Sequence, residues 1–134
     1  MKQLGITILL SIISSFIFAQ NRGDLTIRFN VEEPTGTLMI QLRDSTGEKI
    51  ENRMVPVKST SAQTTFQRLN VGEKYIVAVF QDLNGNEKMD HHFYGPPKEP
   101  YGFSNDARGT MGPPDLKDQW IVISGNMRID IKVE

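Results

Sequence analysis

The sequence predicts an all-β fold, a single antiparallel β-sandwich of about seven strands with one long irregular loop. Short segments in which apolar and polar residues alternate recur along the chain, and turns rich in Gly, Pro, Asn and Asp separate them. No segment shows the 3.6-residue periodicity of an amphipathic helix. Short strands with regularly spaced turns are typical of a sandwich of two packed sheets.

The first strands are predicted from strict alternation. Residues 24–31 and 38–42 carry an apolar residue at every second position, and Pro34–Gly36 supplies a turn between them. This pattern predicts a β-hairpin. A weaker strand is expected at residues 54–58. Because it contains Pro56, which has no backbone N–H, it should lie at a sheet edge.

The remaining strands are predicted in the same way. Residues 62–69 alternate, and residues 75–80 form the most apolar run, rich in β-branched and aromatic residues. We expect the latter to be a central strand that is buried on both faces. Residues 120–123 and 127–133 predict a last hairpin across a Ser-Gly-Asn turn. The whole pattern is consistent with an immunoglobulin-like or prealbumin-like sandwich.

Residues 1–19 have the pattern of a cleavable secretory signal. Lys2 provides a positive charge, residues 4–18 are largely apolar, and Ala19 is a small residue before the expected cleavage point. A retained membrane anchor is the alternative, but the apolar run is shorter than the roughly 20 residues that span a bilayer. We therefore expect a periplasmic or secreted domain of residues 20–134, with no membrane span after signal cleavage.

The composition narrows the classes of function. The chain has no cysteine, so an exported domain must gain any extra stability from packing or from a bound ion. Lys and Arg total 15 against 16 Asp and Glu, and the charges are scattered. Without a basic patch or a stripe of basic and aromatic residues, nucleic-acid binding is not expected.

The segment 82–90 carries the clearest chemical signal, the spacing of a Ca²⁺-binding loop. Oxygen-bearing side chains fall at positions 1, 3, 5 and 9, and a backbone carbonyl would supply position 7. Ca²⁺ prefers six to eight oxygen ligands, which such a loop can turn inward. The predicted metal ligands, including Glu99 as a further carboxylate, are Asp82, Asn84, Asn86, Lys88 (through its carbonyl), Asp90 and Glu99.

The match to an EF-hand loop is partial, and a plain turn is the alternative. Position 6 holds Glu87 instead of Gly, position 12 holds Phe93 instead of Glu, and no flanking helices are predicted. Glu87, Asp106 or water could replace Glu99 as the missing ligand. In the alternative, Asn84-Gly85 would form a type I′ hairpin turn.

Residues 91–117 form the long irregular loop, which is dense in Gly, Pro and aromatic residues. Its aromatic side chains could contact a protein or glycan ligand, or they could pin the loop to the sandwich. The candidate ligand contacts are Tyr94, Tyr101, Phe103, Ser104 and Asn105. Ser104 and Asn105 could instead cap turns.

Catalytic chemistry is only weakly indicated. Glu99, His91 or His92 could serve as a general base, and Glu99 could pair with one of Asp106, Asp115 and Asp118. Nothing in the spacing brings two of these groups together. A transition-metal site at His91-His92 is disfavoured because adjacent residues in an extended chain point in opposite directions.

The central motifs resemble domain-of-unknown-function family 2141. The resemblance rests on the Asp-x-Asn-x-Asn-x-x-x-Asp loop at 82–90, the Gly-x-Pro-x-Glu-x-Tyr-Gly-Phe-Ser-Asn run at 95–105 and the Gly-Pro-Pro turn at 112–114. It implies an exported bacterial β-sandwich, here with a signal of the kind found in Bacteroidetes, and it carries the loop residues over, together with Glu99, Ser104 and Asn105. The chain departs from the pattern at Leu116 and Trp120, which concerns packing. The resemblance implies no activity.

These observations favour an exported, Ca²⁺-stabilised β-sandwich that binds an unknown protein or glycan ligand and is not an enzyme. Two alternatives stay open at this point. One is an extracellular enzyme that uses Glu99 or His91/His92 as general base, and the other is a structural component of a cell-envelope assembly.

Overall fold

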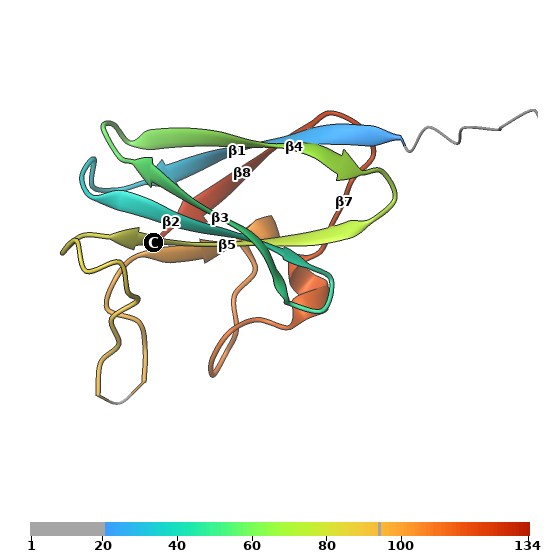
Figure 1. Cartoon of the computed structure of the whole chain (residues 1–134). Helices are drawn as coiled ribbons and strands as arrows, with labels where there is room; N and C mark the ends of the chain where they lie inside the picture. Colours follow the sequence, from blue (N-terminus) through green and yellow to red (C-terminus); the bar gives the residue numbers. More distant parts are fainter. Residues whose placement is uncertain (1–20, 94) are drawn as a thin grey trace, which may run out of the picture.

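In the computed structural model the chain forms two packed β-sheets, which confirms the predicted all-β sandwich (Figure 1). The structure describes residues 21–93 and 95–134. The predicted signal at residues 1–19 and the candidate ligand contact Tyr94 lie outside the described residues. Within the described part of the chain, no helix is both long enough and apolar enough to cross a membrane.

The described residues contain eight strands and two short 3₁₀ helices. They are β1 (Arg22–Val31), β2 (Thr37–Asp44), β3 (Lys49–Pro56), β4 (Ser61–Asn70), β5 (Lys74–Asp82), β6 (Tyr101–Phe103), η1 (Ser104–Asp106), η2 (Leu116–Gln119), β7 (Ile121–Val122) and β8 (Met127–Val133). One sheet has the order β4-β1-β8. The other has the order β3-β2-β5-β6, and β7 also pairs with β5.

The predicted hairpin of β1 and β2 is wrong, because these strands belong to opposite sheets. Both edges of β1 are already used, by β4 on one side and β8 on the other. The chain crosses between the sheets after Val31, and Gln81 holds this crossing by donating two 2.7 Å hydrogen bonds to the carbonyls of Glu33 and Thr35.

The predicted last hairpin is also wrong. β7 pairs with β5, whereas β8 runs parallel to β1, with Leu25 opposite Met127 and Val31 opposite Val133. The sandwich is therefore not wholly antiparallel. The Ser-Gly-Asn turn carries the chain from one sheet to the other instead of reversing it within a sheet.

The predicted edge strand is confirmed in its position, but β3 spans Lys49–Pro56 and not the predicted residues 54–58. The prediction for β5 is confirmed, since it lies inside its sheet with both faces largely buried. The short strand β6 lies within the predicted irregular loop, so that loop is interrupted by sheet pairing at Ala78–Phe80.

The core between the sheets is built from the alternating residues. Every second side chain of β1, β2 and β5 points inward and meets apolar residues of β4, β7 and β8. The largest apolar side chains that are fully buried in this core are Phe29, Phe66, Leu25, Ile27, Leu38, Ile40, Leu42, Ile123 and Ile131.

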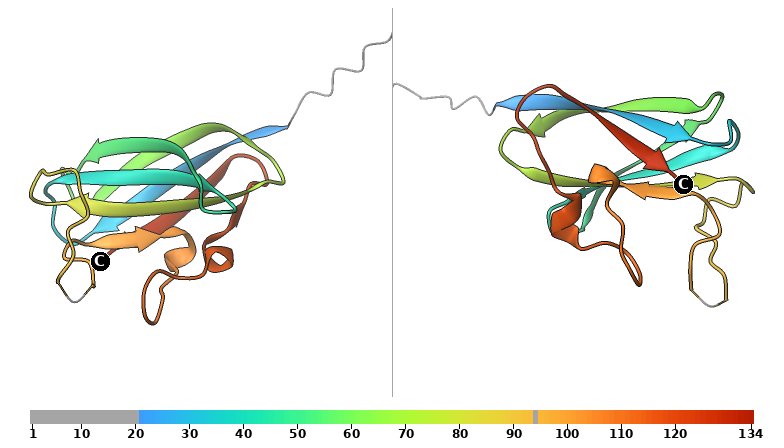
Figure 2. Two further views of the ribbon diagram at one scale, coloured as in Figure 1. Left: turned by 60° about the horizontal axis from the view of Figure 1, so that its bottom comes forward. Right: turned by 180° about the vertical axis from the view of Figure 1, so that it is seen from behind.

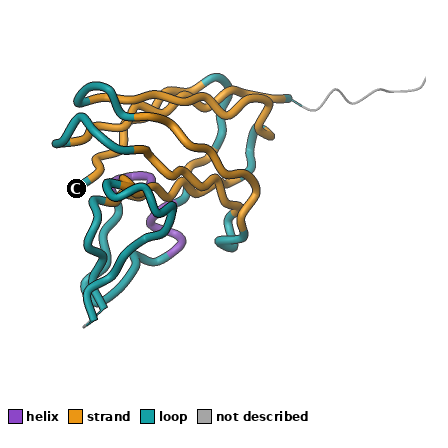
Figure 3. Tube along the Cα trace, turned by 60° about the vertical axis from the view of Figure 1, so that its left-hand side comes forward, coloured by secondary structure: helices purple, strands orange, loops and turns teal. Residues whose placement is uncertain are grey.

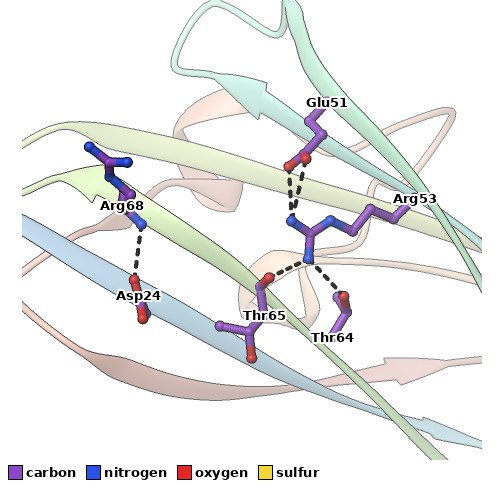
Figure 4. A network of polar contacts seen from close by, with 6 residues as sticks. All are labelled: Asp24, Glu51, Arg53, Thr64, Thr65 and Arg68. Atoms are coloured by element: carbon purple, nitrogen blue, oxygen red, sulfur yellow. Dashed lines mark hydrogen bonds and ion pairs between the residues drawn. The ribbon is translucent and has the colours of Figure 1, made fainter.

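The edge strands β3 and β4 are connected by Arg53 (Figure 4). Its guanidinium donates to the Thr64 hydroxyl at 3.0 Å and to the Thr65 carbonyl, and it lies 4.3 Å from the centre of the Phe66 ring. Glu51 pairs with the same group at 3.3 Å. On this side of the sandwich the two sheets are therefore joined by the side chain of Arg53, because β3 and β4 do not pair through their backbones.

Two long connections project from the outer face of the β3-β2-β5-β6 sheet. Residues 83–93 and 95–100 follow β5 and residues 107–115 follow η1, and both segments extend away from the sandwich on the same side (Figures 2 and 3). The residues singled out in the sequence lie in or beside these two loops.

Candidate metal loop and adjacent groove

Asp82 is the last residue of β5 and begins the candidate metal loop. Its side chain is only 3% exposed, because the close approach of Gly36 packs the β1–β2 crossing against it. A Cβ at Gly36 would lie 2.4 Å from the Asp82 carbonyl oxygen, and Gly36 has a φ of +76°. Both facts require glycine at this contact.

The carboxylate of Asp82 organises the loop around itself. One oxygen accepts the N–H of Gly85 at 2.9 Å, and the other accepts the N–H of Glu87 at 2.9 Å. The amide oxygens of Asn84 and Asn86 each accept the N–H two residues further on, at 3.1 and 3.0 Å. These side-chain turns fix the orientation of both asparagine side chains within the loop.

Glu87 has the backbone conformation that position 6 of a Ca²⁺ loop needs. Its φ is +61°, a left-handed value that is uncommon for residues other than glycine. Glycine holds this position in EF-hands because the chain turns sharply there. Asn84 does not have a positive φ, which a type I′ turn at Asn84-Gly85 would require at both residues. The plain hairpin turn is therefore not formed.

Asp90 lies at the opposite end of the loop, and its carboxylate accepts hydrogen bonds from both asparagine side chains. The Asn84 amide donates to Asp90 at 2.5 Å, and the Asn86 amide donates to both carboxylate oxygens at 3.0 Å. These hydrogen bonds, first that of Asn84 and then that of Asn86, lower the pKa of Asp90. Side chains 84, 86 and 90 thus converge on one point.

Glu99 is brought back to the loop by a short two-limbed ribbon. Lys98 N–H donates to the Asp90 carbonyl at 2.7 Å, and His91 bridges to Pro97. The Glu99 side chain is 7% exposed and accepts the N–H of Leu83 at 3.2 Å and that of Asp90 at 3.5 Å. Burial, and to a lesser degree the charges of Asp82 and Asp90, raise its pKa.

The donor set fits a hard cation. Each carboxylate or amide oxygen that accepts one N–H still has a second lone pair. No ion pair among the described residues involves the carboxylates of Asp82, Asp90 or Glu99. No group of three or more His, Cys, Asp and Glu side chains in the described ranges is close enough to hold a metal. A site here therefore depends on the two asparagines and on the Lys88 carbonyl as well, which favours oxygen-seeking Ca²⁺ over transition metals.

The other proposed ligands and acid–base partners are placed elsewhere. Asp106 accepts the N–H of Lys132 at 2.8 Å, so it ties η1 to β8 and is not available to the loop. Asp115 and Asp118 are exposed at the start of η2 and within it, and neither is a hydrogen-bond partner of Glu99. Of the two histidines, His91 is exposed and lines the groove described below.

Ser104 and Asn105, two of the candidate ligand contacts, hold the protein together internally. The Ser104 hydroxyl is fully buried, accepts the Val77 N–H at 3.1 Å and donates to the Gln119 carbonyl at 2.5 Å. The Asn105 amide donates to the carbonyls of Asp118 and Trp120. Ser104 therefore has a structural role instead of the predicted ligand contact. Both amide N–H groups of Asn105 are also used within the protein.

Tyr101 and Phe103 lie on the outer face of β6 and form part of a groove. Their rings meet edge to face at 5.9 Å, and the Arg108 guanidinium lies 4.5 Å from the Tyr101 ring centre. The groove has a volume of about 1070 Å³ and lies between the two projecting loops. We call it the outer groove. It is lined by strands β2, β3, β5 and β6, by residues 109–113, and by Glu87, Met89, His91, Gly95, Pro96 and Pro97. Tyr101 and Phe103 were predicted from the sequence as ligand contacts, whereas the groove residues of β2, β3 and β5 were not.

Trp120 belongs to neither feature. Its indole N–H donates to the Ser45 carbonyl at 3.0 Å and Lys74 lies 4.1 Å from its ring centre, so it packs beside the β2–β3 turn.

The described residues form a two-sheet β-sandwich with an oxygen-rich loop and an open groove on one outer face. The chain belongs to the family described as "Uncharacterized protein conserved in bacteria (DUF2141)", whose model matches residues 21–130. No curated protein and no solved structure matches the chain.

The raised pKa of Glu99 predicts a specific pH dependence in the presence of EDTA. Between its ordinary pKa and its raised folded value, the folded state binds more protons than the unfolded state, so stability should fall as the pH rises through that window. Glu99→Gln should remove this slope. Asp44 and Asp90, whose pKa values are lowered, act in the opposite direction and at lower pH. Melting curves of both proteins between pH 4 and 7 would measure the difference, and identical slopes would contradict the prediction.

Proposed function

We propose that the protein is an exported, non-enzymatic β-sandwich that binds a ligand and is stabilised by Ca²⁺ in the loop 82–90. The observations that support the ion assignment are the left-handed backbone of Glu87 and the hydrogen bonds that bring the Asn84 and Asn86 side chains to the Asp90 carboxylate. Export rests on the signal pattern at residues 1–19, and a periplasmic or secreted location follows from it.

The proposed ion would be held by the carboxylates of Asp82, Asp90 and Glu99, the amide oxygens of Asn84 and Asn86, and the Lys88 carbonyl. It would offset the repulsion among three carboxylates, two of which are buried. To coordinate the ion, the two asparagine amides would rotate so that oxygen replaces the N–H groups now directed at Asp90. In a chain without disulfides, such an ion would supply stabilisation that packing alone must otherwise provide.

The test is the melting temperature of residues 20–134 in EDTA, in Mg²⁺ and in Ca²⁺. Extracellular sites of this kind have dissociation constants of about 10⁻⁴–10⁻³ M. At 100 times that constant the gain is about 2.7 kcal/mol, which corresponds to roughly 10 °C for a domain of this size. We expect this shift with Ca²⁺ and a smaller one with Mg²⁺.

Asp90→Asn and Asp130→Asn form a matched pair of controls. Asp90→Asn removes a ligand charge at the point where the loop side chains converge. Asp130 lies on β8 in an exposed pair with Arg28, so its substitution should leave the Ca²⁺ shift unchanged. A wild-type melting temperature that is the same in EDTA and Ca²⁺, or an equal shift in both variants, would reject the ion site.

A further inference from the structure

The floor of the outer groove is an apolar row that crosses four strands. The strand registers place four side chains side by side on the outer face, namely Met54, Met39, Phe80 and Tyr101. The next row along the strands is more polar and consists of Asn52, Gln41, Ala78 and Phe103. Cross-strand neighbours of this kind lie about 4.5–5.5 Å apart, so each row forms a continuous surface.

The walls of the groove extend the apolar surface. The loop from β5 to β6 contributes Met89, Pro96 and Pro97, and the loop after η1 contributes Met111 and Pro113. Four methionines from four separate segments therefore surround one space. Methionine side chains are flexible and polarisable, which suits an apolar ligand whose shape is not rigid.

One end of the groove carries an arginine that lacks a carboxylate partner among the described residues. Arg43 is half-buried on β2, and its Nε donates to the Gln41 side chain at 2.7 Å. No acceptor among the described residues takes its terminal N–H groups. Burial lowers the pKa of Arg43, as expected where a guanidinium is removed from water without a counter-charge. The second arginine of the lining, Arg53, is already paired with Glu51 and the β4 residues.

The groove is closed beyond Arg43. Ile76, the partner of Arg43 on β5, points to the same outer face but is fully buried, because η1 and η2 pack against β5 at this end. The other end opens toward Glu87 and His91 on the projecting loop. A ligand with one anionic end would therefore find its charge partner at the closed end and apolar contacts along the open part.

We propose that the outer groove binds an apolar monocarboxylate of the fatty-acid type, with its carboxylate on Arg43 and its chain along Met39, Met54, Phe80 and Tyr101. A guanidinium can hold a carboxylate through two parallel hydrogen bonds, and the terminal N–H groups of Arg43 are available for this. The inference deepens the proposed binding function by naming its ligand class.

Decanoate and decylammonium, below their micellar concentrations, are the probes. They share one apolar chain and carry opposite charges. Isothermal titration of residues 20–134, which contain every described strand and the core, should give at least tenfold tighter binding of decanoate. Arg43→Gln should reduce decanoate affinity about tenfold, whereas Arg128→Gln, the same change on an exposed residue of β8, should leave it unchanged.

Met54→Asn tests the apolar part independently. Met54 is 54% exposed on an edge strand, so the substitution should be tolerated by the fold. It should weaken both probes by a similar factor. Melting curves without ligand should be alike for all three variants and the wild type, which separates lost binding from lost folding.

The result that would overturn the inference is an absence of decanoate binding at millimolar concentration, or equal decanoate affinity in the wild type and Arg43→Gln. The titrations are run in both Ca²⁺ and EDTA. If the protein binds decanoate but its melting temperature does not change with Ca²⁺, the groove proposal is supported and only the ion site is rejected. Conversely, a Ca²⁺ shift without decanoate binding rejects the groove and keeps the ion.

Discussion

Asp82→Ala is expected to lower the free energy of unfolding by about 2 kcal/mol in EDTA. In saturating Ca²⁺ the expected loss is about 4–5 kcal/mol. The first part arises because the N–H groups of Gly85 and Glu87 lose their acceptor, each worth about 1 kcal/mol in a partly exposed loop. The second part is the loss of ion binding. Urea unfolding of the variant and the wild type under both conditions measures the two parts separately.

Asp44→Ala is the matched control for this prediction. Asp44 also accepts two backbone N–H groups, those of Thr46 and Glu48, in a turn between β2 and β3. It should lose a similar amount in EDTA and gain as much from Ca²⁺ as the wild type. If Asp82→Ala kept the full Ca²⁺ gain, Asp82 would not be an ion ligand.

Phe66→Ala is expected to lower the free energy of unfolding by about 3–5 kcal/mol, with or without Ca²⁺. Phe66 is fully buried between the sheets and carries the Arg53 guanidinium over its ring. The alanine variant loses the buried ring, leaves a cavity and removes the platform under the arginine that joins β3 to β4.

Ile50→Ala serves as the comparison for the core substitution. Ile50 is 52% exposed on β3, and a surface change of this kind should stay within about 0.5 kcal/mol. Urea unfolding should show a lower midpoint for Phe66→Ala with an unchanged slope. A loss below about 1 kcal/mol would mean that the core closes around the missing ring.

The strands could be predicted from the sequence because each one has a face toward the core, and alternation reports that face directly. Alternation does not report which strand is the neighbour. The residues of β1 and β2 satisfy the pattern equally well in one sheet or in two, so the hairpin could not be distinguished from a crossing. β6 has only three residues, and Gly102 is there because a Cβ would lie 2.2 Å from the Lys132 carbonyl oxygen, a contact that depends on the fold.

The candidate ion loop was predictable because its spacing is local, whereas the groove is not. Residues 82–90 converge within one loop, and only the positive φ of Glu87 had no sequence signal. The methionines of the groove come from segments far apart in the sequence, and only the strand registers bring Met39 beside Met54. A hydroxyl can bond a ligand or backbone groups equally well, so the sequence leaves both roles open for Ser104, and its burial decides for the backbone.

The parallel pairing of β1 with β8 joins segments that lie far apart in the sequence. β1 is the central strand of its sheet, and one of its two neighbours follows it by about a hundred residues, since Leu25 lies opposite Met127. Contacts that span nearly the whole chain close slowly. Until β8 has paired, β1 has only one neighbouring strand, and Ile27 and Phe29 are not yet covered by Ile131 and Val133. Slow closure of this pairing would lengthen the time that a new chain spends unfolded, which is the form in which a protein is threaded across a membrane, as the proposed export requires.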